Sequence, residues 1–407
     1  MIEAGAFLTL EIEKPAAGGR MLARHEGQIV LVWGAIPGER VRARVERAGK
    51  GVLFADTVDV LDASPDRRDA GPDWRCGGNV LAHVAYARQL RLKGEIIRDA
   101  FGRIGRLPLS DTPEVIGSPE QGYRMRARLH ARNRRLGFYR EGTHDLCSPA
   151  STGQLLPETL AWLASAEEVL QREQLDDVLA LEIAENIPAD ERATHVELRV
   201  ALDAPLYAAL ATEQSSVTDV LHVKEDDPGI VLQLRRDVRA FFQGNRFLLE
   251  RLVRHVMALV PPGPVVDLYA GVGLFGLALA AARTDHVTLV EGDRVSGADL
   301  LANAVPYLDR VDVQRMSVES FLRSTDAVEG ATFIVDPPRT GMSKEALSGI
   351  VKAAPQRLIY VSCDVATLAR DTRTLLDNRY ELESLTGIDL FPNTAHVESI
   401  ATFARTR

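Results

Sequence analysis

The chain has 407 residues, a net charge of -9, 46% apolar residues and three cysteines. This length predicts two or three domains, and the composition is ordinary for chains that bury cores. No run approaches the roughly 20 apolar residues of a bilayer span, and the N-terminus lacks a signal-peptide pattern, so we expect a cytoplasmic protein with no membrane partner. Three cysteines are too few for a disulfide framework, and none lies at zinc-like spacing from another, so we expect no metal site.

Short runs that alternate apolar and polar positions fill the first part of the chain. Glycine-rich and proline-rich turns separate the runs, which is the pattern of a small antiparallel β-barrel. The runs begin at Phe7, Gln28, Arg40 and Val52. A polar, turn-rich linker follows from Asp62.

The middle of the chain contains an amphipathic helix, predicted at 84–105, and then an arginine-rich stretch from Tyr123 to Arg140. Arginines alternate with apolar residues there, and a second strand begins at Gly137, so we predict a hairpin with one cationic face. That face could bind RNA phosphates, with Tyr123, Phe138 and Tyr139 available for stacking. The alternative is a solvated face neutralised by local acids. The candidate RNA-binding residues are Arg124, Arg126, Arg128, Arg132 and Arg134.

From about residue 245, helices alternate with short apolar strands, which predicts a mostly parallel sheet with helices on both faces. The expected fold is therefore α/β. It has an N-terminal β-barrel at 1–62, a central α+β domain at 63–238 and a C-terminal Rossmann-like domain at 239–407.

Ligands of such sheets bind beyond the carboxyl ends of the strands, where the sequence places Asp267, Glu291, Asp336 and Cys363. The turn Gly271-x-Gly273-x-x-Gly276, with Glu291 twenty residues after Gly271, suits NAD, FAD or S-adenosylmethionine. Asp336-Pro337-Pro338 favours the last, because an acid-Pro-Pro segment lines the pocket of methyltransferases that act on nucleobases. The alternative is that the prolines simply end a strand.

Seven segments of the chain follow one another in the order of a known family's motifs: 241–245, 267–273, 290–292, 336–339, 360–364, 367–371 and 389–398. In this combination they resemble the RNA uracil-5-methyltransferase family. Pro37-Gly38-Glu39-Arg40-Val41 resembles the TRAM RNA-binding domain, so the likeness extends over nearly the whole chain. An attached TRAM-like barrel is more typical of members that act on 23S ribosomal RNA than of those that act on tRNA, although tRNA stays an alternative.

The resemblance implies a monomeric enzyme that methylates C5 of a uridine in RNA, with S-adenosylmethionine as the donor. Cys363 would be the nucleophile that adds to C6 of uracil, and Glu398 the base that later removes the hydrogen from C5. The target base would have to be flipped into the pocket. The implied cofactor-binding residues are Gln243, Tyr269, Glu291 and Asp336.

The chain departs from the family pattern at an iron-sulfur site. Cys76 and Cys147 match two of four ligand positions, but Ala70 and Asn79 occupy the other two. Because a cubane ordinarily needs four thiolates, we expect no cluster and interpret the two cysteines as remnants of a metal site. Val365 and Leu274 are smaller departures, where relatives usually have proline and asparagine.

Two alternatives of other classes stay open. One is an RNA-binding protein with a decayed enzyme core, which the missing cysteines favour. The other is a NAD-dependent oxidoreductase, which the glycine turn allows but which leaves Cys363 and the segment from Asp389 to Glu398 unexplained.

Overall fold

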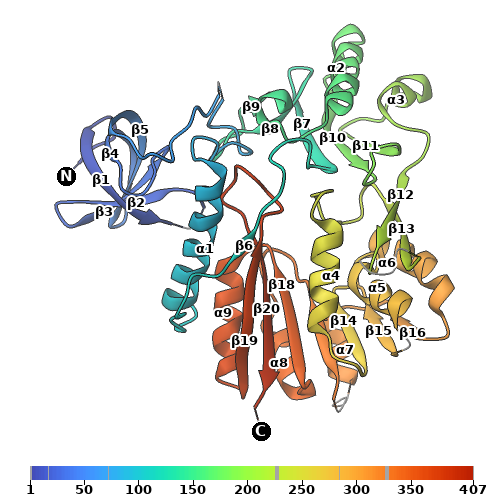
Figure 1. Ribbon diagram of the computed structural model, residues 1–407. Coiled ribbons are helices and arrows are strands. Elements are labelled where there is room, and N and C mark those ends of the chain that lie inside the picture. The colour runs from blue at the N-terminus through green and yellow to red at the C-terminus, as the bar shows by residue number, and fades with distance from the viewer. Residues whose placement is uncertain are drawn as a thin grey trace.

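The computed structural model describes residues 2–16, 18–71, 73–224, 229–283, 285–325 and 330–406. It contains a small N-terminal barrel, a central five-stranded sheet and a large C-terminal sheet, which lie side by side in Figure 1. None of the helices in the described part of the chain combines the length and the apolar composition of a membrane span.

The N-terminal barrel is closed, with strand order β1-β2-β3-β5-β4. Leu8, Leu10 and Ile12 of β1 alternate with exposed residues and point into the barrel core. The expected barrel is confirmed, except that β3 pairs with β5 in parallel. A closed ring with an odd number of strands cannot be antiparallel throughout, so one parallel pair is required. The strands are β1 (Phe7–Pro15), β2 (Met21–His25), β3 (Gln28–Trp33), β4 (Arg40–Gly49) and β5 (Val52–Asp62).

The C-terminal sheet has eight strands in the order β16-β15-β14-β17-β18-β20-β19-β6. Strands β14 to β18 pair in parallel, as predicted, whereas β20 lies antiparallel between β18 and β19. The order reverses direction at β14, which makes the space between β14 and β17 the topological switch point. The strands are β6 (Val115–Ile116), β14 (Val265–Leu268), β15 (Val287–Val290), β16 (Val311–Gln314), β17 (Thr332–Val335), β18 (Arg357–Ser362), β19 (Tyr380–Ile388) and β20 (Glu398–Arg405).

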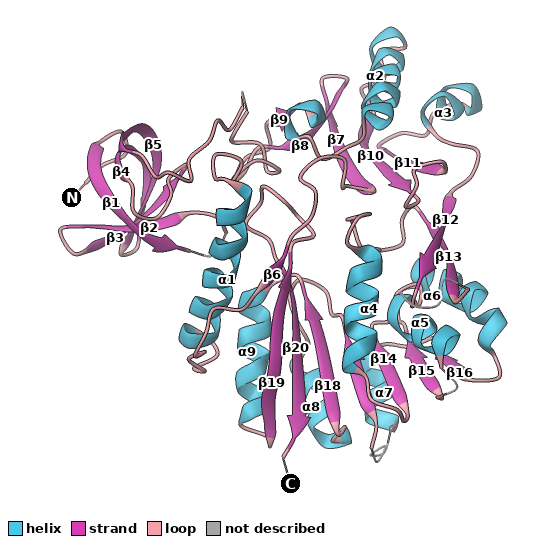
Figure 2. Ribbon diagram, viewed as in Figure 1, coloured by secondary structure: helices cyan, strands magenta, loops and turns pink. Residues whose placement is uncertain are grey.

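Helices cover both faces of this sheet (Figure 2). Val265 and Ile334 point into the core beneath one group of helices, whereas Val266 and Phe333 point into the core beneath the other. This alternation confirms a strand buried on both faces, as expected of a parallel sheet. The first group is α4 (Leu249–Leu259), α5 (Leu274–Ala282) and α6 (Arg294–Ala304); the second is α1 (Tyr86–Arg103), α7 (Val318–Ser324), α8 (Lys344–Ala353) and α9 (Val365–Leu376).

The central sheet has the order β11-β10-β7-β8-β9 and carries the predicted arginine hairpin as β7 and β8. Helix α2 packs on one face, where Leu163 and Leu170 meet Leu129 and Phe138. The elements are β7 (Arg126–Arg132), β8 (Arg135–Tyr139), β9 (Leu146–Cys147), α2 (Pro157–Arg172), β10 (Val178–Glu185), β11 (Arg192–Leu198), α3 (Ala204–Leu210) and the separate pair β12 (Ser216–His222) and β13 (Val231–Asp237).

One segment of the middle stretch is built into the C-terminal part. Helix α1, the predicted amphipathic helix, packs against α9, and β6 extends the large sheet by pairing with β19. The domain boundaries at residues 62 and 238 therefore stay predictions.

Cys76 and Cys147 are joined in a disulfide, with an S–S distance of 2.05 Å. Our interpretation of them as remnants of a metal site did not anticipate this bond. Cys76 forms a β-bridge with Arg140, and Cys147 pairs with Phe138, so both cysteines lie at the same end of β8. Sequence spacing did not reveal this contact, because 71 positions separate the two residues.

Candidate active site

A cavity of about 640 Å³ lies at the carboxyl ends of the parallel strands. Tyr269, Glu291, Asp336 and Cys363 directly follow β14, β15, β17 and β18, and all four line this cavity. The volume is typical of a site for a small molecule or cofactor. The strand-end residues that the sequence singled out therefore converge at the switch point, apart from Asp267, which is buried beneath it.

Contacts with Asp267 and Leu289 fix the shape of the glycine turn after β14. The Asp267 carboxylate accepts a hydrogen bond from the Gly276 amide at 2.8 Å, and a Cβ at Gly276 would lie 2.1 Å from Leu289. Gly271 has φ +60° and open space where a Cβ would be, so its backbone can approach a ligand closely. Glu291 accepts a hydrogen bond from the Gly271 amide at 2.7 Å, which fixes the turn against the end of β15.

Tyr269 is the non-glycine residue of this turn with a left-handed backbone, at φ 62°. Such a conformation is uncommon for a bulky residue and costs of order 1–3 kcal/mol. The strain directs the half-buried tyrosine ring into the cavity beside the glycine turn.

The antiparallel register of β20 brings Glu398 next to Cys363. Ser399 pairs with Ser362, so the residue that begins β20 lies beside the residue that follows β18. Both side chains line the cavity, and Glu398 is 2% exposed whereas Cys363 is half-buried. The sequence matched these residues to a nucleophile and a base, but only the strand register accounts for their proximity.

Two carboxyl groups in the cavity lie close enough to interact. Burial raises the pKa of Asp336 to about 7, opposed by a hydrogen bond that Gln243 Nε2 donates to its Oδ2 at 3.2 Å. Burial and the nearby Asp336 raise the pKa of Glu398 well above its usual range, and Arg339 opposes this shift. Neighbouring carboxylates of this kind resist being charged together, so the pair can hold a proton near neutral pH.

The Cys363 thiol is the third titratable group of the cavity. Burial and, to a smaller extent, Glu398 raise its pKa to about 12, whereas the charge of Arg339 and a hydrogen bond from it lower the pKa. The free thiol is therefore protonated near neutral pH, and the reactive thiolate has to be generated when a substrate is bound.

Arg339 and Phe391 line the cavity but were not chosen from the sequence. Arg339 directly follows Asp336-Pro337-Pro338. This position beside a strand end was the signal from which the sequence could have indicated it as a site residue. Phe391 lies in the loop between β19 and β20, inside the segment 389–398 that carries the resemblance, but it was not assigned a role there.

The five candidate RNA-binding arginines have different surroundings. Arg124 and Arg126 line the cavity, and Arg124 donates to Gln154 at 2.6 Å. Arg128 pairs with Glu182 and Glu197, Arg132 with Asp145, and Arg134 with Asp176. Acidic neighbours thus partner the outer three arginines, as the alternative interpretation of this stretch anticipated.

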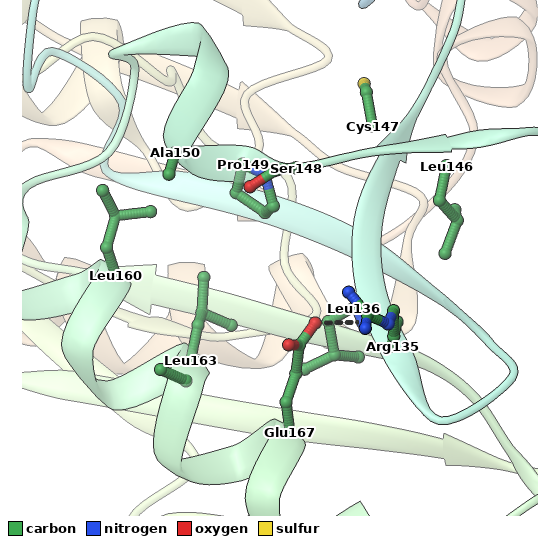
Figure 3. Close-up of a pocket in the computed structure, with 11 residues that line it drawn as sticks. Arg135, Leu136, Leu146, Cys147, Ser148, Pro149, Ala150, Leu160, Leu163 and Glu167 are labelled. Carbon is green, nitrogen blue, oxygen red and sulfur yellow. Dashed lines mark hydrogen bonds between the residues drawn. The ribbon is translucent and has the colours of Figure 1, made fainter.

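A second cavity, of about 290 Å³, lies between α2 and the β8–β9 hairpin (Figure 3). Its carboxylate, Glu167, accepts a hydrogen bond from the Leu136 amide at 2.6 Å, and the Cys147 side chain points away from the cavity toward its disulfide partner. The lining is mainly aliphatic, and its Glu167 carboxylate already accepts a backbone hydrogen bond. The larger cavity is therefore the better candidate for an active site.

Comparison with known families identifies two regions. The family model described as tRNA (uracil-5-)-methyltransferase matches residues 168–406, and the TRAM domain model matches residues 3–58. Together they account for the barrel and for the sheet that carries the cavity.

Individual relatives match over almost the full chain. An RNA methyltransferase of Streptomyces avermitilis is 32% identical, over 98% of each chain. The 23S rRNA (uracil(1939)-C(5))-methyltransferase RlmD of Pseudomonas putida is 30% identical, over 99% of this chain and 94% of its own. The crystal structure of Pyrococcus abyssi tRNA (uracil-54, C5)-methyltransferase with S-adenosyl-L-homocysteine has a TM-score of 0.75 and 22% identity, and covers 97% of this chain and 99% of its own, which shows a shared fold.

Proposed function

Because the chain belongs to the tRNA (uracil-5-)-methyltransferase family, we propose that it transfers a methyl group from S-adenosylmethionine to C5 of a uridine in 23S ribosomal RNA. The observation that carries this proposal is the convergence of Cys363 and Glu398 in one cavity with the four candidate cofactor residues. The Pseudomonas relative, named for 23S rRNA and matched along nearly the whole chain, supports ribosomal RNA as the substrate.

The residues beside the glycine turn fit S-adenosylmethionine. Gly271 leaves its backbone open to a ligand, and the Glu291 carboxylate lies at the end of the neighbouring strand, where an acid binds ribose hydroxyls in folds of this type. Tyr269 and the Gln243–Asp336 pair line the adjoining wall. When bound, S-adenosylmethionine would supply an electrophilic methyl group.

Cys363 would begin the reaction on the uracil ring. Its sulfur adds to C6, and the electrons of the C5–C6 double bond move to the C4 carbonyl oxygen, which makes C5 nucleophilic enough to accept a methyl group. The thiol must first lose its proton, since burial raises its pKa to about 12. Arg339 beside the sulfur favours the charged thiolate, and Asp336 would take the thiol proton, which leaves the Glu398 carboxylate free for the later step.

Glu398 would complete the reaction. After methylation, C5 bears both the new methyl group and its original hydrogen, and the Glu398 carboxylate removes that hydrogen as a proton. The released electron pair restores the C5–C6 double bond and expels the Cys363 thiolate. The pairing register of β18 and β20 places Glu398 beside the Cys363 thiol. Glu398 can therefore act after Cys363 without a rearrangement of the sheet.

The remaining parts of the chain would hold the RNA. We propose that the barrel at 1–62 and the central stretch at 63–238 bind RNA, that 239–407 bind the cofactor, and that the protein acts as a cytoplasmic monomer without a membrane partner. Arg124 and Arg126 line the cavity, so they would meet phosphates of the RNA whose target base enters it.

The test is methylation by the purified full-length protein. Transcripts of 23S rRNA and of tRNA are incubated separately with S-adenosylmethionine, and nucleosides are analysed for 5-methyluridine by mass spectrometry. We expect 5-methyluridine in the ribosomal transcript and none with Cys363→Ala. Product in tRNA alone would redirect the proposal to tRNA, and RNA binding without product in either transcript would favour the decayed-core alternative.

A further inference from the structure

The outer face of the central sheet carries an array of three rings beside the arginines of β7. The rings of His130 and Tyr139 stack with their centroids 3.8 Å apart and their planes 13° apart. His144 meets Tyr139 edge-on, with centroids 5.3 Å apart and planes at 76°. We call His130, Tyr139 and His144 the ring array.

The ring array lies on the face of the sheet that α2 does not cover. Ala127 and Leu129 of β7 point toward α2, so the alternate residues of that strand point the other way. In β8 the same alternation buries Leu136 and Phe138 against α2 and places Tyr139 on the opposite face. His144 is exposed, and the other two rings are half-buried.

This face leads directly from the proposed active site. Arg126 lines the cavity, and Arg128 and His130 follow at alternate positions on the same face of β7. At about 3.3 Å per residue, His130 lies roughly 13 Å along the strand from Arg126. Because Arg126 lines the cavity, RNA whose target base occupies the cavity can continue along this strand.

Charge alone does not make this face a strong site for phosphates. Arg128 is held by Glu182 at 2.6 Å and also pairs with Glu197, so its charge is largely compensated. Burial and Arg128 both lower the pKa of His130, so its ring is neutral near pH 7. Neutral stacked rings beside compensated arginines suit the flat surface of a base better than a phosphate.

We propose that the ring array is a stacking site for an unpaired base of the substrate RNA, near the uridine that enters the cavity. This inference rests on the proposed function and names one site by which that substrate is held. Base stacking on aromatic side chains tolerates any base, so the array would contribute affinity and placement, not sequence specificity.

The test uses the full-length protein and short single-stranded RNA oligomers. Each oligomer contains one uridine and a 2-aminopurine at a different distance from it, because stacking quenches 2-aminopurine fluorescence. We expect quenching at one set of positions with the wild-type protein and with Tyr139→Phe. Tyr139→Leu should remove the quenching and weaken binding about 5- to 100-fold, from the cost of losing one stacked base.

Tyr307→Leu is the matched control, since Tyr307 is also half-buried but lies beyond α6, beside Arg310 at the far edge of the large sheet. S-adenosylmethionine binding reports whether each variant is folded, and His144→Ala provides a second variant at an exposed position. Unchanged quenching and affinity in both Tyr139→Leu and His144→Ala, or no oligomer bound by the wild type, would overturn the proposal. Methylation of transcripts by the wild type separates this failure from a failure of the proposed function.

Discussion

Lys93 and Asp389 form a fully buried ion pair, with Nζ 2.6 Å from Oδ1. Lys93 belongs to α1, and Asp389 begins the loop that contains Phe391 and ends at Glu398. Lys93 also donates to the Phe391 carbonyl at 3.0 Å, and Tyr86 of the same helix donates to Asp389 Oδ2 at 3.0 Å. Helix α1 therefore holds the loop that places the candidate base, although it contributes no residue to the cavity lining.

Replacing Lys93 by methionine should destabilise the protein and misplace this loop. The Asp389 charge would stay buried without its partner, which costs about 3–5 kcal/mol in comparable sites. We expect a loss of that size in urea unfolding and a fall in kcat with little change in KM for S-adenosylmethionine. The double variant Lys93→Met, Asp389→Asn should regain most of the stability, and a loss below about 1 kcal/mol in the single variant would contradict the role of the pair.

The reactivity of Cys363 can be measured without RNA. The other two cysteines are joined in a disulfide, so alkylation by iodoacetamide reports on this thiol alone. Because burial raises its pKa to about 12, alkylation should be slow at pH 7 and accelerate steadily through pH 9. Arg339→Gln should slow it further, since the guanidinium favours the thiolate, whereas Arg373→Gln on the neighbouring helix should not. A rate that levels off below pH 8 would show that the thiol is activated in the free protein.

Glu398→Gln separates methyl transfer from product release. The amide cannot take the proton from C5, so the RNA should remain attached to Cys363 after methylation. With ordinary RNA, we expect Glu398→Gln to form a protein–RNA complex that survives denaturing electrophoresis. The complex should be absent from a double variant that also carries Cys363→Ala. Free 5-methyluridine formed at the wild-type rate would exclude Glu398 as the base.

The arrangement of the C-terminal half could be predicted from sequence because its signals are local. Strands β14, β15, β17 and β18 are each followed directly by a candidate site residue, and parallel strands place their carboxyl ends at one edge of the sheet. Tyr269, Glu291, Asp336 and Cys363 therefore converge as soon as the strands are assigned. Glu398 is different, because it lies at the start of an antiparallel strand, and its position depends on a register that the pattern alone does not specify.

The arginine stretch shows what a local pattern cannot give. Alternation correctly predicted a hairpin, but the acids that neutralise Arg128 and Arg134 come from β10, β11 and the segment after α2, far along the chain. The disulfide was hidden for the same reason, since β8 and β9 bring its cysteines together only in the folded protein.

Asp267 should make stability depend on pH. Burial raises its pKa to about 8, above the value of about 4 in an unfolded chain, so the folded state binds more protons between these two values. The free energy of unfolding should therefore fall as pH rises from 4 to 8, by at most about 1.4 kcal/mol per pH unit for this group. Asp267→Asn keeps an acceptor for the Gly276 amide and should flatten the profile in urea unfolding. Asp336 and Glu398 act in the same direction, so a residual slope is expected, but an unchanged slope would contradict the assignment.

The Cys76–Cys147 disulfide should be detectable by thiol counting and should contribute to stability. Under denaturing conditions the untreated protein should react with one equivalent of Ellman's reagent, and the reduced protein with three. The bond closes a loop with a sequence separation of 71, which constrains the unfolded chain, so reduction should lower the free energy of unfolding by about 2–4 kcal/mol. Cys76→Ala with Cys147→Ala should reproduce that loss and make stability insensitive to the reductant. Three reactive thiols in untreated protein purified under air would show that the bond does not form.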